Sequence, residues 1–181
     1  MQPVYDLDKL EVPSKLLIMV RGLPGSGKSL IAKLLTSDKG VAISVDDFLT
    51  NPNGQYEFSK NNFIAAQDAC KQYCRELMQN NTKVIVVHNT MSQAWEASDY
   101  FNFANEFEYA VQVISLYDNG LNDMALANRG LHFMPSHLIQ KCRQKWDLDI
   151  YPHRQRVMDM DSTHRSSPDP KIYLHVKKPN Q

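Results

Sequence analysis

Apolar positions in this chain alternate between continuous runs and helically spaced stripes, and the pattern predicts strands and helices in turn. The apolar run at 16–20 predicts a first strand at 16–21 that is buried on both faces. Residues 59–78 predict a helix with Phe63, Ala66, Cys70, Tyr73 and Leu77 on one face, and Cys70 and Cys74, four residues apart, are expected to be small core residues. Further strands are expected at 41–45, 84–87 and 111–117, and further helices at 95–107, 121–129 and 135–146. This order favours an α/β fold in which helices cover a parallel sheet.

Local signals predict how several elements begin and end. Thr90 and Gln93 have the spacing of a capping box ahead of the helix expected at 95–107, and Gly130 suits a left-handed cap after the helix expected at 121–129. Residues 151–170 show no apolar period and predict a loop, whereas the alternation at 171–176 predicts a last strand. We therefore expect a three-layer domain with a parallel sheet of about five strands.

The segment that follows the first strand matches the pattern G-x-x-x-x-G-K-[ST], in which glycines let backbone N–H groups turn inward around phosphate. Its residues are Gly22, Leu23, Pro24, Gly25, Ser26, Gly27, Lys28 and Ser29. Lys28 is suited to neutralise the β and γ phosphates, and the Ser29 hydroxyl is suited to bind Mg²⁺. The sequence therefore predicts a P-loop, extending to Leu30, that binds ATP or GTP together with Mg²⁺.

Two carboxylates, Asp46 and Asp47, come directly after the second strand and should lie at the sheet edge that carries the P-loop. Because adjacent side chains leave an extended backbone on opposite sides, we expect one to face the site while the other packs or caps. Phosphoryl transfer depends more on orientation than on basicity, so an ordinary ionised carboxylate suffices as proton acceptor. We expect Asp46 to be the catalytic base and Asp47 to contact substrate.

The third strand ends in His88, Asn89 and Thr90, three polar residues expected on the substrate side. A P-loop protein usually offers an acidic residue to the metal's water shell at the first of these positions. His88 is a poor partner for Mg²⁺, and two interpretations stay open: it hydrogen-bonds substrate, or it is a half-buried structural histidine. The other five histidines lack ligand spacing, and Trp95 and Trp146 are expected in the core.

Composition bounds the class of protein. The 181 residues, 43% of them hydrophobic, suit a single domain with its core at about 15–146. Twenty basic and twenty acidic residues cancel, which argues against coating nucleic acid or membrane by bulk charge. Residues 1–128 hold ten basic and fifteen acidic residues, a net of −5, and residues 129–181 hold ten and five, a net of +5. This basic third is either a face for a phosphorylated substrate or an ordinary solvated surface.

Cysteine usage and hydropathy indicate the compartment. Three cysteines without C-x-x-C spacing do not suit a zinc or redox site, and no apolar run approaches membrane-spanning length. The beginning of the chain lacks the basic head and apolar block of a secretory signal. We expect a reducing compartment, cytoplasmic or nuclear.

Five motifs together resemble the polynucleotide-kinase-like P-loop family, in particular the P-loop domain of the NEDD-four-binding-protein-two-like group. They occupy residues 21–29, 44–48, 54–58, 86–90 with Trp95 and Glu96, and 126–132. The resemblance implies a 5′-hydroxyl polynucleotide kinase type of domain in which Asp46 is the base, Arg129 of a lid helix contacts the ATP phosphates and Thr90 lines the substrate side. The chain departs from the family pattern at His88, at Asn128 and at Leu49, where phage-type kinases carry an arginine that grips the substrate.

The sequence thus predicts an ATP- and Mg²⁺-dependent phosphotransferase that moves the γ-phosphate to a hydroxyl at a nucleic-acid end. Two alternatives remain open. One is a nucleotide-binding pseudokinase that serves as a protein-interaction module, and the other is a kinase of the same fold that acts on a small metabolite.

Overall fold

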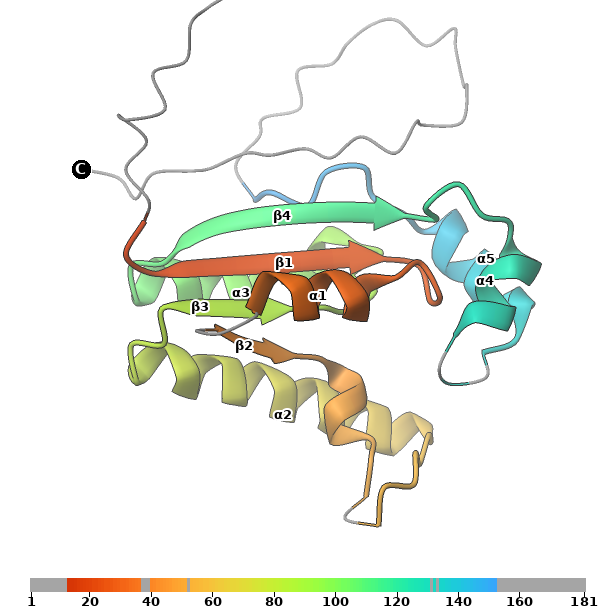
Figure 1. Ribbon diagram of the computed structural model, residues 1–181, viewed down its shortest axis with the longest axis horizontal. Coiled ribbons are helices and arrows are strands. Elements are labelled where there is room, and N and C mark those ends of the chain that lie inside the picture. Colours follow the sequence, from red (N-terminus) through yellow and green to blue (C-terminus); the bar gives the residue numbers. More distant parts are fainter. Residues whose placement is uncertain (1–12, 37–39, 52, 131, 133, 153–181) are drawn as a thin grey trace, which may run out of the picture.

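A four-stranded parallel sheet forms the middle layer of the computed structural model, which describes residues 13–36, 40–51, 53–130, 132 and 134–152 (Figure 1). The elements follow in the order β1 (Leu16–Gly22), α1 (Lys28–Thr36), β2 (Gly40–Ile43), the short 3₁₀ helix η2 (Val45–Phe48), α2 (Lys60–Gln79), β3 (Val84–Val87), α3 (Ala94–Glu106), β4 (Ala110–Tyr117), α4 (Asp123–Arg129) and α5 (Ser136–Gln144). The strand order is β2-β3-β1-β4, with Met19 paired to Val87 on one side of β1 and to Val113 on the other. The predicted α/β class is confirmed.

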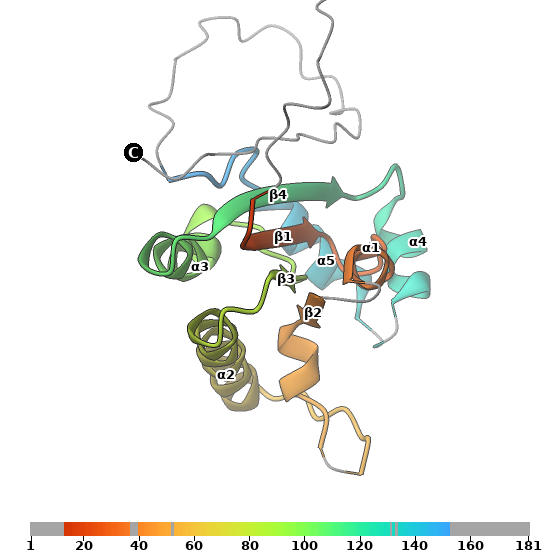
Figure 2. The ribbon, with the colours of Figure 1, turned by 60° about the vertical axis from the view of Figure 1, so that its left-hand side comes forward.

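Helices cover the two faces of the sheet, α1 on one and α2 with α3 on the other (Figure 2). β1 is apolar throughout its first five residues because it lies in the middle of the sheet, where Leu17 and Met19 face one helix layer and Ile18 and Val20 face the other. Cys70 and Cys74 are buried, free thiols on the inner face of α2, as their spacing predicted. The predicted strand at 171–176 and nearly all of the predicted loop at 151–170 lie outside the described residues.

The segment after α5 packs back against the core, where it contacts the end of β1 and the start of α3. The buried Arg21 guanidinium at the end of β1 stacks 3.9 Å from the centre of the Trp146 ring and donates to the backbone oxygens of Ser92 and Asp147. The Asp147 carboxylate in turn accepts from the Ala94 amide at the first turn of α3. Trp146 is therefore packed as expected, and Ile150 and Tyr151 also pack against the core.

Several local predictions were wrong. Helix α3 is capped by Asp147 rather than by a Thr90–Gln93 box, since the Gln93 side chain makes no capping hydrogen bond. Gly130 has φ −61° and ψ 133°, an extended rather than a left-handed conformation. Trp95 is 63% exposed on the outer side of α3, because the inner face is filled by Ala97, Tyr100 and Ala104.

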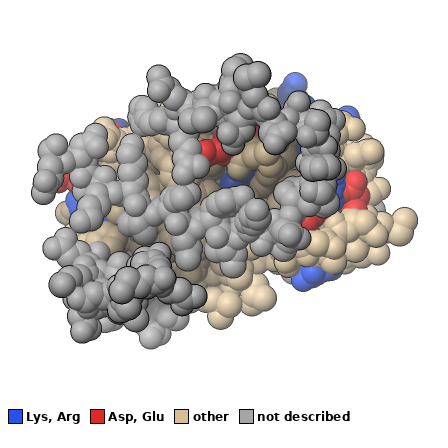
Figure 3. Space-filling model, turned by 90° about the horizontal axis from the view of Figure 1, so that it is seen from above, with Lys and Arg blue, Asp and Glu red and all other residues tan. Residues whose placement is uncertain are grey.

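Charge on the described surface is mixed. In the view from above, Lys and Arg lie beside Asp and Glu at the end of the molecule that carries α4 and α5 (Figure 3). Among the described residues, no helix is both long and apolar enough to cross a bilayer.

Candidate nucleotide-binding site

The predicted P-loop turns from β1 into α1 at the carboxyl ends of the strands (Figure 1). Gly25 and Gly27 have φ +80° and +101°, left-handed values that glycine adopts without strain. Within the described residues, the N–H groups of Gly25, Gly27, Lys28 and Ser29 have no protein acceptor. Four unpaired amides at the start of a helix form an anion-binding concavity, and this arrangement fits the phosphates of a nucleotide.

The remaining P-loop residues differ in burial. Leu23 is fully buried against Leu126 of α4 and Ile139 of α5, so its side chain belongs to a small core beside the loop. Ser26 is fully buried and its hydroxyl has no hydrogen-bond partner in the described structure. The Leu30 side chain is 63% exposed and does not belong to this core. Pro24 is half-buried at the tip of the loop.

Lys28 folds back onto its own loop. Its ammonium group donates to the Leu23 carbonyl oxygen at 3.1 Å. Removal from water lowers the pKa of Lys28 to about 8, and the neighbouring negative charge of Asp46 opposes the shift. An incoming phosphate would replace the carbonyl as partner and stabilise the protonated amine, as the predicted role requires.

Asp46 and Asp47 lie on η2 and not on extended backbone, because β2 ends at Ile43, two residues earlier than predicted. The Asp47 carboxylate accepts from the Ser44 amide at 2.7 Å and completes a capping box. Asp46 is exposed, and one of its oxygens accepts from the Tyr56 hydroxyl at 3.3 Å. Asp47 therefore caps η2, whereas we expected it to contact substrate, and Asp46 is the carboxylate that is open to a ligand.

The residues after β3 join the two strand ends that frame the site. The His88 amide donates to Ile43 of β2, and the Thr90 oxygen accepts from Gly22 at 3.3 Å. The Asn89 side chain accepts from the Val45 amide at 2.8 Å and lies 3.9 Å from the Cys70 sulfur. The Asn89 side chain therefore binds the start of η2, whereas the sequence suggested a contact with substrate.

The His88 ring occupies the position where an acidic residue was expected. Burial lowers the pKa of His88, and this effect outweighs the opposing charge of Asp47. The lowered pKa favours the neutral imidazole, and the ring lies close enough to Asp47, Lys28 and Asp46 for their charges to affect it. Both interpretations of His88 remain compatible with this half-buried position.

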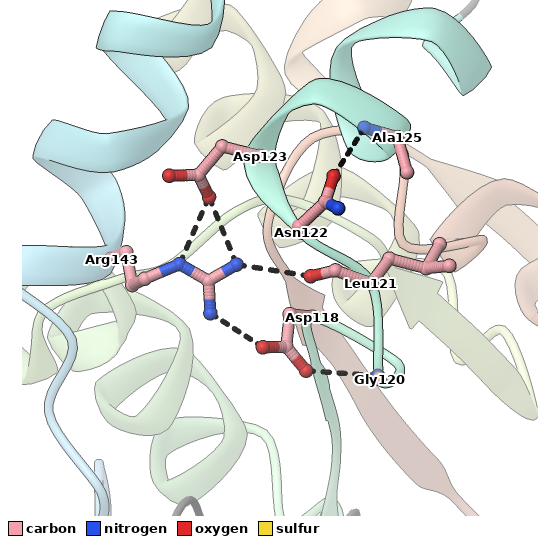
Figure 4. A network of polar contacts seen from close by, with 7 residues as sticks. All are labelled: Asp118, Gly120, Leu121, Asn122, Asp123, Ala125 and Arg143. Atoms are coloured by element: carbon pink, nitrogen blue, oxygen red, sulfur yellow. Dashed lines mark hydrogen bonds and ion pairs between the residues drawn. The ribbon is translucent and has the colours of Figure 1, made fainter.

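Arg129 is the last residue of α4 and is exposed. In the described part of the chain it forms no ion pair or hydrogen bond through its side chain. Its helix is held by Arg143 of α5, which binds Asp123 and the Leu121 oxygen on one side and Asp118 on the other (Figure 4). These contacts raise the pKa of Arg143 despite partial burial and leave Arg129 as the cation of α4 that a ligand can reach.

Sequence reasoning missed two long-range pairs. Arg21 and Trp146 are described above, and the second pair is Tyr56 with His132, whose rings stack at 3.8 Å and 8°. Tyr56 and His132 both fall within motifs of the resemblance, but neither motif states a role for them, and ring pairing between residues this far apart leaves no local signal.

The fold and the site define a P-loop protein of the kinase-like α/β class. A family model described as "AAA domain" matches residues 17–117, more than half of the chain. The chain belongs to this family.

Individual relatives agree with that assignment. Over 97 residues the chain is 36% identical to human NEDD4-binding protein 2, a match that covers 52% of the chain and 5% of the relative. The chain is also 27% identical over 103 residues to the 2′,3′-cyclic-nucleotide 3′-phosphodiesterase of Pongo abelii, a match that covers 55% of the chain and 24% of the relative. The chain thus spans from a twentieth to a quarter of these relatives. The resemblance inferred from the motifs is confirmed.

A solved structure supports the fold. The structure of the Pnkp1/Rnl/Hen1 RNA repair complex superimposes with a TM-score of 0.57 over 76% of this chain and 46% of the other, at 20% identity. At this identity the likeness concerns the arrangement of strands and helices.

Proposed function

We propose that this domain is an ATP-dependent phosphotransferase that moves the γ-phosphate to a hydroxyl group, with the 5′ end of a nucleic acid as acceptor. The observation that carries the proposal is that Lys28 of the P-loop and the exposed Asp46 lie close enough for their charges to interact. A phosphate bound at Lys28 and a hydroxyl held at Asp46 would then be neighbours.

The described residues suit each part of such a reaction. The free amides of the P-loop and the Lys28 ammonium would bind the β and γ phosphates, and Arg129 would reach them from α4. The Ser29 hydroxyl oxygen at the start of α1 is suited to be a ligand of Mg²⁺. When bound, this ion neutralises charge on the phosphates.

Transfer of the γ-phosphate forms one bond and breaks another. The acceptor oxygen forms a bond to the γ-phosphorus while the bond from that phosphorus to the bridging oxygen breaks. The electron pair of the broken bond leaves with ADP, and the hydroxyl proton passes to the free oxygen of Asp46. Because bond formation is slight in the transition state, holding the hydroxyl in line matters more than a strong base.

The name of one relative and the motif resemblance support a nucleic-acid end as the acceptor. One relative is named for action on cyclic nucleotides, and the five motifs are those of a polynucleotide-kinase-like domain. A binding module without transfer is the second candidate. It is favoured by His88, because a neutral imidazole does not replace the carboxylate that usually orders the water shell of Mg²⁺.

The test uses the full chain, γ-labelled ATP with Mg²⁺, and an oligonucleotide with a free 5′-hydroxyl. We expect label in the oligonucleotide, none when its 5′ end already carries phosphate, and transfer slowed by roughly 10² to 10⁴ in Asp46→Asn. Asp68→Asn, which removes an exposed carboxylate on α2, is the matched control and should keep the parent rate. ATP binding without transfer to the oligonucleotide or to a panel of small alcohols would favour the binding module. Transfer to a small alcohol alone would identify a metabolite kinase.

A further inference from the structure

Residues 49–51 and 53–57, which follow η2, form the two arms of a hairpin. The Glu57 amide donates to the Leu49 oxygen at 2.8 Å, and the Asn51 amide donates to the Gln55 oxygen at 2.8 Å. The Asn51 side chain accepts from the amides of Asn53 and Gln55 and donates to the Glu57 carboxylate at 2.8 Å. The Asn51 side chain thus connects the two arms of the hairpin through hydrogen bonds.

Tyr56 lies on the returning arm of this hairpin, bridged to Thr50 on the outgoing arm. Its hydroxyl donates to Oδ1 of Asp46 at 3.3 Å, while the Thr50 hydroxyl donates to the Asp46 backbone oxygen at 3.2 Å. Asp46 is therefore held through its backbone and through one carboxylate oxygen. In the described structure the second oxygen, Oδ2, makes no hydrogen bond and is open to a ligand.

The Tyr56 ring is held from the other side by His132. The two rings are 3.8 Å apart and nearly parallel, with an interplanar angle of 8°. His132 follows Arg129 by three residues, so the stack joins the hairpin to the chain that leaves α4. Burial, together with the Asp46 carboxylate, raises the pKa of Tyr56 to about 12, so its hydroxyl stays protonated and remains a donor at any working pH.

We propose that Tyr56 is a positioning residue for Asp46, and that the His132 ring keeps the Tyr56 hydroxyl in place. This inference rests on the proposed function. An exposed carboxylate samples several rotamers, and one directed hydrogen bond selects the rotamer that leaves Oδ2 toward the acceptor hydroxyl. His132 acts only through Tyr56, so its contribution disappears when the tyrosine hydroxyl is absent.

Steady-state transfer by the full chain tests this order of action. Tyr56→Phe keeps the stack and removes the hydrogen bond, and we expect kcat to fall roughly tenfold while KM for ATP stays constant. His132→Ala should lower kcat by a similar or smaller factor, and His132→Phe, which retains a planar ring, should restore it. The decisive variant is the double change, which should be no slower than Tyr56→Phe alone. Tyr73→Phe and His137→Ala, at exposed positions, should match the parent chain.

A second readout does not require activity. In protein labelled with ¹³C at aspartate carboxyl carbons, the Asp46 resonance is assigned by its loss in Asp46→Asn. We expect it to shift in Tyr56→Phe and in His132→Ala and to stay in Tyr73→Phe. An unmoved resonance, a parental kcat in Tyr56→Phe, or losses that multiply in the double variant would overturn the inference. A shifted resonance in a chain that transfers no phosphate would support the positioning contact and reject the proposed function, so the two failures are distinguishable.

Discussion

The backbone oxygen of Leu126 in α4 lies 2.1 Å from the position that a Cβ atom on Gly25 would occupy. The tip of the P-loop and the helix that carries Arg129 therefore touch through backbone atoms. A methyl group at residue 25 would push α4 away, and it would also place an L side chain at φ +80°.

Gly25→Ala should therefore destabilise the fold more than Gly27→Ala does. Residue 27 has φ +101° but no atom within 4 Å of its Cβ position, so alanine there meets only the backbone strain. We expect a loss of about 1–2 kcal/mol at residue 27 and at least about 1 kcal/mol more at residue 25. Urea unfolding measures both, and equal losses would show that α4 does not rest on the loop.

The lowered pKa of Lys28 predicts how nucleotide affinity depends on pH. Below about pH 8 the free protein carries the ammonium group that phosphate requires, and above it the amine is neutral. Affinity for ATP should fall by about half between pH 7 and pH 8 and by up to about tenfold per unit at higher pH, until the pKa of the complex is reached. In Lys28→Arg the guanidinium stays charged, so calorimetric titrations should show no break near pH 8. A break that persists in this variant would assign the titration to another group.

Arg21 gives a prediction about stability. Its guanidinium spans two backbone oxygens and one indole ring, although burial lowers its pKa to about 10. Arg21→Met leaves both oxygens without their donor and should cost about 2 kcal/mol of unfolding free energy. Arg75 pairs with Glu106 at the surface, so Arg75→Met should cost under about 1 kcal/mol. Similar losses in the two variants would contradict a special role for Arg21.

Replacing Asn89 distinguishes a structural role of this residue from a contact with substrate. Its side-chain oxygen is the acceptor for the Val45 amide at the start of η2. Asn89→Ala should lower the free energy of unfolding by about 1–2 kcal/mol, because that amide loses its partner. If Asn89 instead contacts the acceptor, thermal unfolding stays unchanged and KM for the oligonucleotide rises.

The sequence predicted the parts of the fold that depend on local pattern. The apolar runs of β1 and β3, the stripe of α2 and the P-loop are all readable within one element, and the structure has them at almost the expected residues. The errors concern contacts between distant segments. Asp147 takes the capping role expected of Thr90, and the Ser44–Asp47 box ends β2 early.

The candidate site shows the same division. The order of the motifs predicted that Lys28 and Asp46 lie at one edge of the sheet, and in the structure they are close enough for their charges to interact. The Tyr56–His132 stack and the hold of Arg143 on α4 depend on tertiary packing between segments that share no sequence pattern. Such contacts become visible only when the chain is folded.

Equilibrium titration of the full chain with ATP and Mg²⁺ tests most directly whether residues 22–30 form a nucleotide site. We predict saturable binding of one nucleotide that weakens at least roughly tenfold in Lys28→Ala, whose loop amides remain but whose cation is gone. The exposed Lys33→Ala, on the same helix, should bind as the parent does. Absence of binding for both ATP and GTP, or equal affinity in the parent and Lys28→Ala, would contradict the account.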